Sequence, residues 1–240
     1  DLTPIPLRKK TELSVLQSSG PRLGGLLTKD IGELKRIFLS PGPIFDPEDR
    51  MDDYWGYTEA FYSVGFRPGD VVQVTFNYHL SPAGLMFEEP LRNLGCASIP
   101  AGPTDPGTQL DIMQKLRVSG YVGTASYLMH LAQKAEEKGI NLRKDLFQEV
   151  AFVTGERLSE KMRNQLEKKF DIILRQGYGT ADVGCIGYEC FHKTGLHISN
   201  RCYVEICHPD TGIPLKDGEV GEIVVTSFNK TYPLIRLATG

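Results

Sequence analysis

Hydrophobic positions recur along this chain with two alternating spacings. Between residues 51 and 65, apolar or partly apolar side chains come every three or four residues, which predicts a helix with one buried face. Residues 71–76, by contrast, form a short run rich in β-branched side chains and predict a buried strand. Similar patterns predict further helices at 83–94, at 107–117, from Ser126 as N-cap to Gly139, and around Leu158, Met162 and Leu166, and further strands at 96–100, 121–123, 150–153 and 171–174.

This alternation of strands and helices is typical of the α/β class, with a mostly parallel, doubly wound sheet and helices on both of its faces. The pattern changes near residue 195. Residues 198–206 and 222–226 predict strands joined by a Pro-Asp-Thr-Gly turn at 209–212, with no helix between them. The sequence therefore predicts an α/β core over residues 1–195 and a small antiparallel or barrel-like β unit over residues 196–240.

Composition narrows the class of function without identifying it. Of the 240 residues, 40% are hydrophobic and 24% are charged, as in ordinary globular proteins, and the formal net charge is -3. That charge gives no electrostatic reason to expect nucleic acid as a partner. The apolar runs fall well short of the roughly 20 residues that span a bilayer, so no membrane segment is expected.

The cysteines indicate a reducing compartment. There are five of them, an odd number, and four lie between residues 185 and 207. In a chain of this size the pattern favours reduced thiols or a metal site over a framework of disulfide bonds. The first residues also lack the charged-then-apolar layout of a signal peptide. We therefore expect the protein in the cytoplasm.

Two segments that follow predicted strands carry residues suited to binding a nucleotide. In open α/β sheets, ligands bind beyond the carboxyl ends of the strands. Glycines beside an aromatic residue let a flat ring lie against exposed backbone, and a nearby hydroxyl and carboxylate suit a phosphate oxygen and Mg²⁺. A glycine-rich turn with a surface acid is the competing interpretation. The two segments hold Gly155 and Glu156, and Gln176, Gly177, Tyr178, Gly179, Thr180 and Asp182.

A series of short motifs extends from Ser40 to the end of the chain. They are Phe-Arg-Pro-Gly-Asp at 66–70, Leu-Gly-Cys at 94–96, Gly-Thr-Ala-Ser-Tyr at 123–127, Gly-Glu at 155–156, Gln-Gly-Tyr-Gly-Thr at 176–180, Glu-Cys at 189–190, Gly-Leu-His-Ile at 195–198, Val-Gly-Glu-Ile-Val at 220–224 and Tyr-Pro-Leu-Ile-Arg at 232–236. In order and spacing the series resembles phenylacetate–coenzyme A ligases, members of the acyl-adenylate-forming, AMP-binding superfamily. No single motif carries the resemblance by itself.

The resemblance implies an AMP-forming acid–thiol ligase. A carboxylic acid would attack the α-phosphate of ATP to give an acyl-adenylate and pyrophosphate, and coenzyme A would then displace AMP to give a thioester. The expected partners are a small-molecule carboxylic acid, ATP and coenzyme A, and a homodimer is left open. Because negative charge concentrates at phosphorus in the first step, Mg²⁺ and fixed donors are expected there.

The resemblance also assigns roles to individual residues. It places Gly155 and Glu156 beside adenine, Tyr178 on its face, Thr180 at a phosphate and Asp182 at Mg²⁺. Residues in matching motifs that are expected to bind the nucleotide are Ser40, Gly42, Gln176, Gly177, Gly179 and Arg236. An aromatic-rich segment expected near the acid holds Phe76, Tyr78 and His79, for which core packing or a structural role is the alternative.

Three departures from the family pattern qualify this expectation. The phosphate loop, of the form SSGTTGKPT in the family, is replaced by residues 40–47, which keep Ser40 and Gly42 but carry three prolines and no lysine. Residue 182 is Asp where Glu is common. The chain ends at Gly240, before the family's ribose-binding Asp, hinge and lid domain. This fragment is therefore expected to be an N-terminal core that is inactive by itself.

A cluster of cysteine and histidine residues predicts either a structural zinc site or free thiols. The cluster comprises Cys185, Cys190, His192, His197 and Cys202. Thiolate and imidazole are the preferred zinc ligands, although no close Cys-x-x-Cys pair is present. From the resemblance, Cys190 and His197 are the first candidates and Cys202 the next, with further ligands expected beyond the end of this chain.

The leading hypothesis is an ATP-dependent acid–coenzyme A ligase that acts on an aromatic or related carboxylic acid. Two alternatives stay open. One is a non-catalytic nucleotide- or adenylate-binding homologue with a degenerate phosphate loop, which the prolines favour and the Tyr178–Asp182 segment opposes. The other is an adenylating enzyme that passes the acyl group to an acceptor other than coenzyme A.

Overall fold

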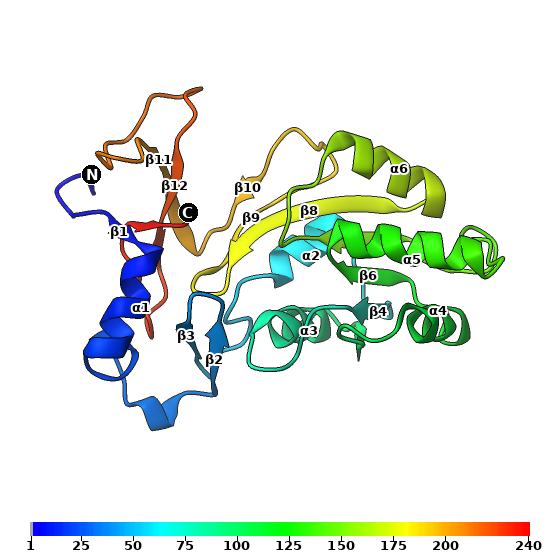
Figure 1. Ribbon diagram of the computed structural model, residues 1–240, viewed down its shortest axis with the longest axis horizontal. Helices are drawn as coiled ribbons and strands as arrows, with labels where there is room; N and C mark the ends of the chain where they lie inside the picture. Colours follow the sequence, from blue (N-terminus) through cyan, green and yellow to red (C-terminus); the bar gives the residue numbers. More distant parts are fainter. Residues whose placement is uncertain (1) are drawn as a thin grey trace.

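A seven-stranded sheet forms the centre of the molecule (Figure 1). The structure is a computed structural model and describes residues 2–240. Strands run parallel in the spatial order β5-β4-β6-β7-β8, and β9 and β10 extend the sheet beyond β8 in antiparallel pairing. The strands are β4 (Val71–Val74), β5 (Ala97–Pro100), β6 (Gly120–Gly123), β7 (Val150–Val153), β8 (Ile173–Thr180), β9 (Gly184–Tyr188) and β10 (His197–Ile198).

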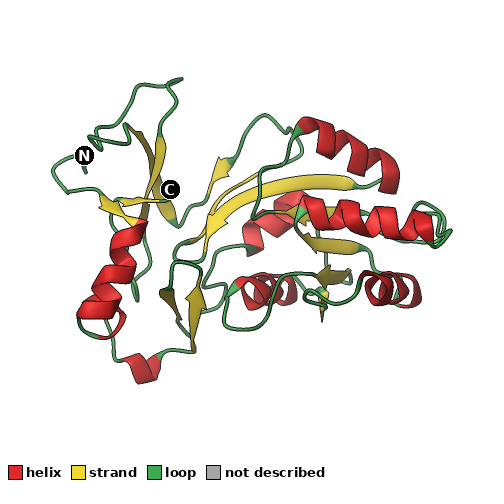
Figure 2. Ribbon diagram, in the orientation of Figure 1, coloured by secondary structure: helices red, strands yellow, loops and turns green. Residues whose placement is uncertain are grey.

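Helices pack on both faces of this sheet, because successive residues of a strand point to opposite sides. In β7, Phe152 lies in the core cluster formed with α2 and α3, and its ring centroid is 5.1 Å from that of Phe61. Ala151 and Val153 lie in the cluster formed with α4, α5 and α6. The helices are α2 (Thr58–Val64), α3 (Ala83–Asn93), α4 (Pro106–Lys115), α5 (Ala125–Glu137) and α6 (Glu160–Phe170). The predicted doubly wound α/β fold is confirmed (Figure 2).

Polar side chains determine where two of these helices begin. The Ser159 side chain accepts a hydrogen bond from the backbone N–H of Met162 and caps α6. Thr124 does the same for α5, with the N–H of Tyr127 as donor. The prediction that Ser126 caps α5 is therefore wrong. Ser126 lies inside the first turn of the helix, and its hydroxyl donates a hydrogen bond to Glu156 in the loop after β7.

A second sheet of four strands lies at the opposite end of the molecule from α4 (Figure 1). Its antiparallel strands are β11 (Cys202–Cys207), β12 (Glu222–Ser227) and β13 (Leu237–Ala238), which confirms the predicted small β unit. Its fourth strand, β1 (Arg8–Lys9), was not predicted; it comes from the N-terminal region and pairs parallel with β13. The division of the chain at residue 195 stays a prediction.

The N-terminal helix lies at the same end of the molecule as the small sheet (Figure 1). Helix α1 (Lys10–Ser19) follows β1 directly and leads into two short 3₁₀ helices, η1 (Arg22–Gly25) and η2 (Ile31–Glu33). A β-hairpin of β2 (Arg36–Ser40) and β3 (Ile44–Glu48) then lies between α1 and the large sheet (Figure 1).

Three predicted elements differ from those observed. Residues 51–57 form turns and not the start of a helix, because Asp53 has a positive φ of 49° and its carboxylate accepts the N–H groups of Tyr57 and Thr58. The predicted strand at 198–206 is divided between β10 and β11. Most consequentially, β8 continues through Thr180, so the Gln-Gly-Tyr-Gly-Thr motif lies on a strand and not in the loop after it.

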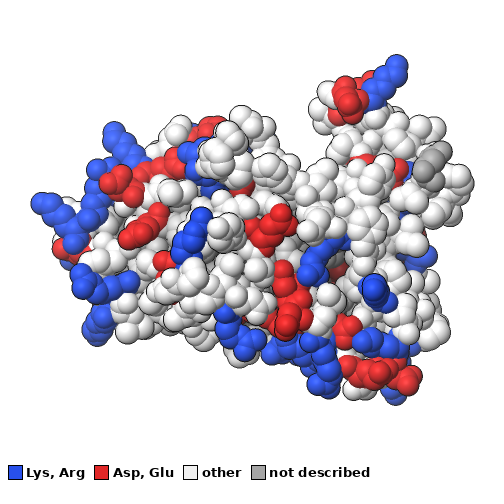
Figure 3. Space-filling view, turned by 180° about the vertical axis from the view of Figure 1, so that it is seen from behind, with Lys and Arg blue, Asp and Glu red and all other residues white. Residues whose placement is uncertain are grey.

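Among residues 2–240, no helix is long and apolar enough to cross a bilayer. On the face shown in Figure 3, basic and acidic side chains are interspersed. That distribution matches the small net charge of the chain.

The core on the α5 face provides a first test of the packing. We expect Leu131→Ala to lower the free energy of unfolding by about 2–5 kcal/mol, because this fully buried side chain would leave a cavity. Leu116→Ala is the matched control, since that leucine is 55% exposed. Urea denaturation monitored by circular dichroism measures both. Equal losses for the two variants would contradict the assignment of Leu131 to the core.

Candidate functional site

Two cavities adjoin at the carboxyl ends of the parallel strands, where the fold predicts a ligand. The larger has a volume of about 440 Å³ and the smaller about 120 Å³. Both are lined by Thr154, Gly155 and Gly179, which form their common boundary. The larger cavity is otherwise lined by Glu156, Arg157, Gln176, Gly177, Tyr178, Leu196 and Ile223. The smaller is otherwise lined by Tyr57, Phe76, Ser81, Pro82, Ala83, Met86, Phe87, Thr180 and Ala181.

The loop after β7 is tied to the start of α5. Glu156 accepts hydrogen bonds from the backbone N–H of Ser126 at 2.6 Å and from its hydroxyl at 2.9 Å. A carboxylate is favourable there because the N-terminal end of a helix carries partial positive charge. Gly155, with φ of 83°, makes the turn that a side chain would strain. Glu156 thus lines the larger cavity while its carboxylate holds the loop in place.

Strand β8 lies directly against aromatic side chains at two of its glycines. A Cβ atom on Gly177 would lie 2.3 Å from the Phe152 ring, and one on Gly179 would lie 2.2 Å from the Tyr57 hydroxyl. Between them, Tyr178 lines the larger cavity. Its hydroxyl donates to the Thr239 Oγ1 atom at 2.8 Å, which joins the cavity wall to the segment that ends β13.

The structure places the predicted acid-binding residues in different surroundings. Phe76 lines the smaller cavity, and its ring centroid is 4.9 Å from that of Phe87. Tyr78 instead packs against Gly84 at the start of α3, where a Cβ atom would come within 2.6 Å of its ring. His79 is exposed and lines neither cavity. Of the three, only Phe76 belongs to the site as described.

The hairpin that replaces the phosphate loop stands apart from both cavities. Ser40 is buried, and its hydroxyl donates to the Ile44 carbonyl at 3.4 Å. Gly42 is exposed at the tip, with φ of 141°. Neither residue lines a cavity. The prolines on either side of Gly42 offer no N–H group to a phosphate.

Asp182 faces the interior and not the cavities. Its side chain is fully buried, and one carboxylate oxygen lies 3.0 Å from the Nζ atom of Lys10 on α1. Thr180, which lines the smaller cavity, accepts from the N–H of Val183 at 3.3 Å and so holds the turn that buries Asp182. A cation already neutralises this carboxylate. As arranged here, Asp182 does not fit the expected role of a Mg²⁺ ligand.

A second buried carboxylate, Asp46 of β3, belongs to the same cluster. Burial and repulsion by Asp182 raise the pKa of Asp46 to about 7, against the opposing effects of the Ser40 hydroxyl and Lys10. The two acids therefore have only one positive charge, that of Lys10, to balance them. The three side chains meet between α1, the hairpin and the turn after β8.

Arg236 lies in the core of the small-sheet region, with 2% of its surface exposed. Its guanidinium donates to Glu205 at 3.1 Å and to the carbonyl oxygens of Ile5 at 2.8 Å and Gly212 at 2.7 Å. These bonds connect the N-terminal segment to β11 and to the turn that precedes β12. Arg236 lines neither cavity, so its position fits a structural role better than a role in nucleotide binding.

The predicted zinc ligands are not gathered into a site. Over residues 2–240, no group of three His, Cys, Asp or Glu side chains is arranged to hold a metal ion. Cys202 lies in an apolar cluster with Ile186 and Val225, and burial raises the pKa of its thiol to about 11. His197 is exposed on β10, and Cys190 is half-buried with its Sγ atom near the N–H of His192.

Several residues of the site escaped the reasoning from sequence. Tyr57, Met86 and Phe87 line the smaller cavity, yet from the sequence the last two were only part of a predicted helix at 83–94. Arg163, which hydrogen-bonds to Glu189 behind Gln176, gave no signal, and Glu189 appeared only within the Glu-Cys motif at 189–190. Arg163 sits among charged residues of α6, a pattern that is usually solvent-exposed.

The sequence and the fold identify the family. A model of the AMP-binding enzyme family matches residues 54–230, and the chain belongs to that family. Its similarity is to phenylacetate-coenzyme A ligases in particular. The enzyme of that name from Pseudomonas putida is 30% identical over 74% of this chain and 41% of that protein. The one from Thermus thermophilus is 28% identical over 100% of this chain and 55% of that protein.

Solved structures agree with this assignment at the level of the fold. An open conformation of 2-hydroxyisobutyryl-CoA ligase, in complex with 2-HIB-AMP and CoA, superposes with a TM-score of 0.91 over 98% of this chain and 54% of that one, at 22% identity. Apo MatB from Rhodopseudomonas palustris gives a TM-score of 0.64 over 84% of this chain and 41% of that one, at 17% identity. The chain thus spans about half the length of the relatives it matches.

The buried acid pair predicts a pH-dependent stability. The pKa of Asp46 in the fold, about 7, is above its ordinary value of 3.8, so between these values the native state binds more protons than the unfolded chain. The contribution of Asp46 to the free energy of unfolding must therefore fall as pH rises through this window. Asp46→Asn removes the ionisation, so its advantage over the wild type should grow by roughly 2–3 kcal/mol from pH 5 to pH 8.

Chemical denaturation at both pH values measures the effect. Asp52→Asn, at an exposed position, is the matched control and should change stability by the same amount at pH 5 and pH 8. A pH-independent difference between Asp46→Asn and the wild type would mean that Asp46 is ionised in the folded protein at pH 5.

Proposed function

We propose that this chain carries the nucleotide- and acid-binding part of an ATP-dependent acid–coenzyme A ligase. The observation that supports this most directly is the pair of adjoining cavities with a common boundary at Thr154, Gly155 and Gly179. The lining of the larger includes the polar residues Glu156 and Gln176 and the aromatic ring of Tyr178, as a nucleotide needs. The smaller is lined mostly by apolar side chains, as an organic acid needs.

In this proposal adenine lies against Tyr178 in the larger cavity, and the acid places its apolar part between Phe76, Phe87 and Met86. The carboxylate then points to the common boundary, where the α-phosphate would also lie. Holding the two reactants there favours attack by the carboxylate oxygen on phosphorus. The bond from phosphorus to the pyrophosphate oxygen breaks, which leaves an acyl-adenylate. The thiolate of coenzyme A then attacks the acyl carbon and AMP departs.

The smaller cavity suggests the class of acid. Its volume of about 120 Å³ and its walls from Tyr57, Phe76 and Phe87 suit one aromatic ring or an aliphatic group of similar size. A long-chain fatty acid would not fit this space. Phenylacetate-coenzyme A ligase is the name of the curated relatives, and an aryl acid of that size is the substrate we propose.

The proposal also covers the metal ion, Mg²⁺, and the cellular compartment, the cytoplasm. Mg²⁺ would enter as the complex with ATP, and Asp182, paired with Lys10, would supply no ligand in the arrangement described. Within residues 2–240, Cys190, His197 and Cys202 do not form a zinc site by themselves. The five cysteines are all unpaired, which suits the reducing cytoplasm.

Acid-dependent exchange of pyrophosphate into ATP tests the first half-reaction. We expect exchange with phenylacetate or benzoate and little with octanoate, because the smaller cavity accommodates one ring. Thioester formation on addition of coenzyme A tests the second half-reaction. Exchange without a thioester would point to a different acyl acceptor. No exchange with any acid, in folded protein, would favour the non-catalytic homologue with a degenerate phosphate loop.

The aromatic wall provides a test by mutation. Tyr178→Ala should weaken ATP binding by about 1–3 kcal/mol if the ring stacks on adenine. Tyr178→Phe keeps the ring and loses only the bond to Thr239, so it should bind ATP nearly as the wild type does. Tyr203→Ala, on β11 and 51% exposed, is the matched control. Calorimetry measures the affinities, and wild-type affinity in Tyr178→Ala would remove this residue from the nucleotide site.

A further inference from the structure

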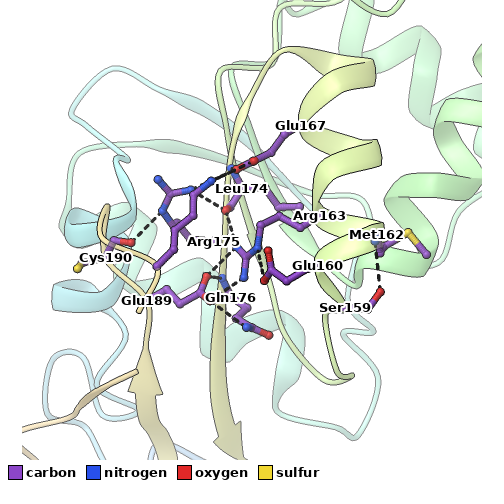
Figure 4. A network of polar contacts seen from close by, with 11 residues as sticks. Ser159, Glu160, Met162, Arg163, Glu167, Leu174, Arg175, Gln176, Glu189 and Cys190 are labelled. Atoms are coloured by element: carbon purple, nitrogen blue, oxygen red, sulfur yellow. Dashed lines mark hydrogen bonds and ion pairs between the residues drawn. The ribbon is translucent and has the colours of Figure 1, made fainter. Parts of the chain in front are cut away.

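Gln176 is held from behind by a buried ion pair that lines neither cavity (Figure 4). Glu189, which follows β9, accepts hydrogen bonds from the backbone N–H of Gln176 at 3.0 Å and from its side-chain Nε2 atom at 2.9 Å. Arg163 of α6 donates to both oxygens of the same carboxylate, at 2.9 and 2.7 Å. The side chains of Arg163 and Glu189 are 2% and 4% exposed.

The ion pair is fixed to the sheet on its other side. Arg163 also donates to the carbonyl oxygen of Leu174 on β8, at 3.0 Å. Its remaining partner, Glu160, is 74% exposed and lies on the same helix. Burial acts to raise the pKa of Glu189, but the hydrogen bonds from Arg163 and Gln176 outweigh it and hold that pKa below its ordinary value. Glu189 is therefore an ionised carboxylate at neutral pH.

The charge on Glu189 determines which way the Gln176 amide points. An ionised carboxylate accepts hydrogen bonds and donates none, so Gln176 must turn its NH₂ group toward Glu189. The opposite orientation would place the carbonyl oxygen of the amide against a negative charge. With the NH₂ group engaged, the Oε1 atom is left as a hydrogen-bond acceptor on the side away from Glu189. Gln176 lines the larger cavity, so that acceptor is available to a ligand there.

We propose that Arg163 and Glu189 are positioning residues that set the base preference of the site by fixing the Gln176 amide with its acceptor toward the bound base. The inference rests on the proposed function, in which adenine occupies the larger cavity. Adenine carries an amino donor at position 6, whereas hypoxanthine carries a carbonyl acceptor there. A fixed acceptor attracts the first and repels the second, although neither Arg163 nor Glu189 touches the nucleotide.

The test compares AMP and IMP, which differ in the base at this position. Calorimetry on the wild-type protein should give tighter binding of AMP. In the double variant Arg163→Met/Glu189→Met, the amide is free to present its oxygen to adenine or its NH₂ group to hypoxanthine, so the ratio of AMP to IMP affinity should fall about tenfold, the equivalent of one hydrogen bond. Glu160→Gln, which alters only the exposed partner of Arg163, is the matched control and should keep the wild-type ratio.

Replacing both charges avoids leaving one of them buried without a partner. A purely structural role would lower both affinities together and leave their ratio unchanged, so an unchanged ratio in the folded double variant overturns the inference. A second measurement does not depend on that variant. In the wild-type protein, the side-chain NH₂ signal of Gln176, assigned in NMR spectra by its loss in Gln176→Leu, should exchange slowly with water.

The two proposals fail in different ways. Rapid exchange of the Gln176 NH₂ group would overturn the positioning role while leaving nucleotide binding intact. No binding of AMP by the folded wild-type protein would overturn the proposed function and this inference with it. Preference for AMP that is lost in the double variant and kept in Glu160→Gln would support both.

Discussion

The site depends on strand β8, which must lie directly against aromatic side chains at two of its positions. Gly177 and Gly179 let β8 lie directly against Phe152 and Tyr57, and a methyl group at either position would collide with a ring or its hydroxyl. That close approach brings Tyr178, on the opposite side of the strand, to the cavity. It also places Gly179 at the boundary of both cavities. Because Gly177 and Gly179 have no side chains, the strand can approach closely enough to place Tyr178 at the cavity.

Two buried ionic groups support this strand, and they differ in charge balance. Arg163 and Glu189 match one positive with one negative charge, and hydrogen bonds satisfy both. Asp46 and Asp182 share Lys10, so the second group has one acid too many. The first group is suited to fixing an amide in one orientation. The second is suited to holding a proton near neutral pH, because removing it would leave an uncompensated charge in the interior.

Features of the fold that depend on neighbouring residues could be predicted from the sequence, and features that depend on residues far apart in the chain could not. The α/β alternation is encoded in local periodicity, so most helices and strands could be assigned from the sequence. Strand β8 could not be followed through Thr180, because glycines disfavour a strand unless packing requires them. Tyr178, Gln176 and Gly155, which the family resemblance assigns to the nucleotide, line the larger cavity, and their roles stay predictions. The pairing of Lys10 with Asp182 joins residues far apart in the chain, and no local pattern carries it.

The pairing of β1 with β13 has a consequence for the order of folding. These two-residue strands align Arg8 with Leu237 and Lys9 with Ala238, so the register of β1 determines where the next residue, Lys10, emerges. A slip by one residue would move Lys10 by roughly 3.3 Å and turn neighbouring side chains to the other face. Loop closure across almost the entire chain must precede this contact. Lys10 therefore reaches its place beside Asp182 only when the two distant segments have met, so the register of this short pairing and the charge balance of the buried acids are coupled.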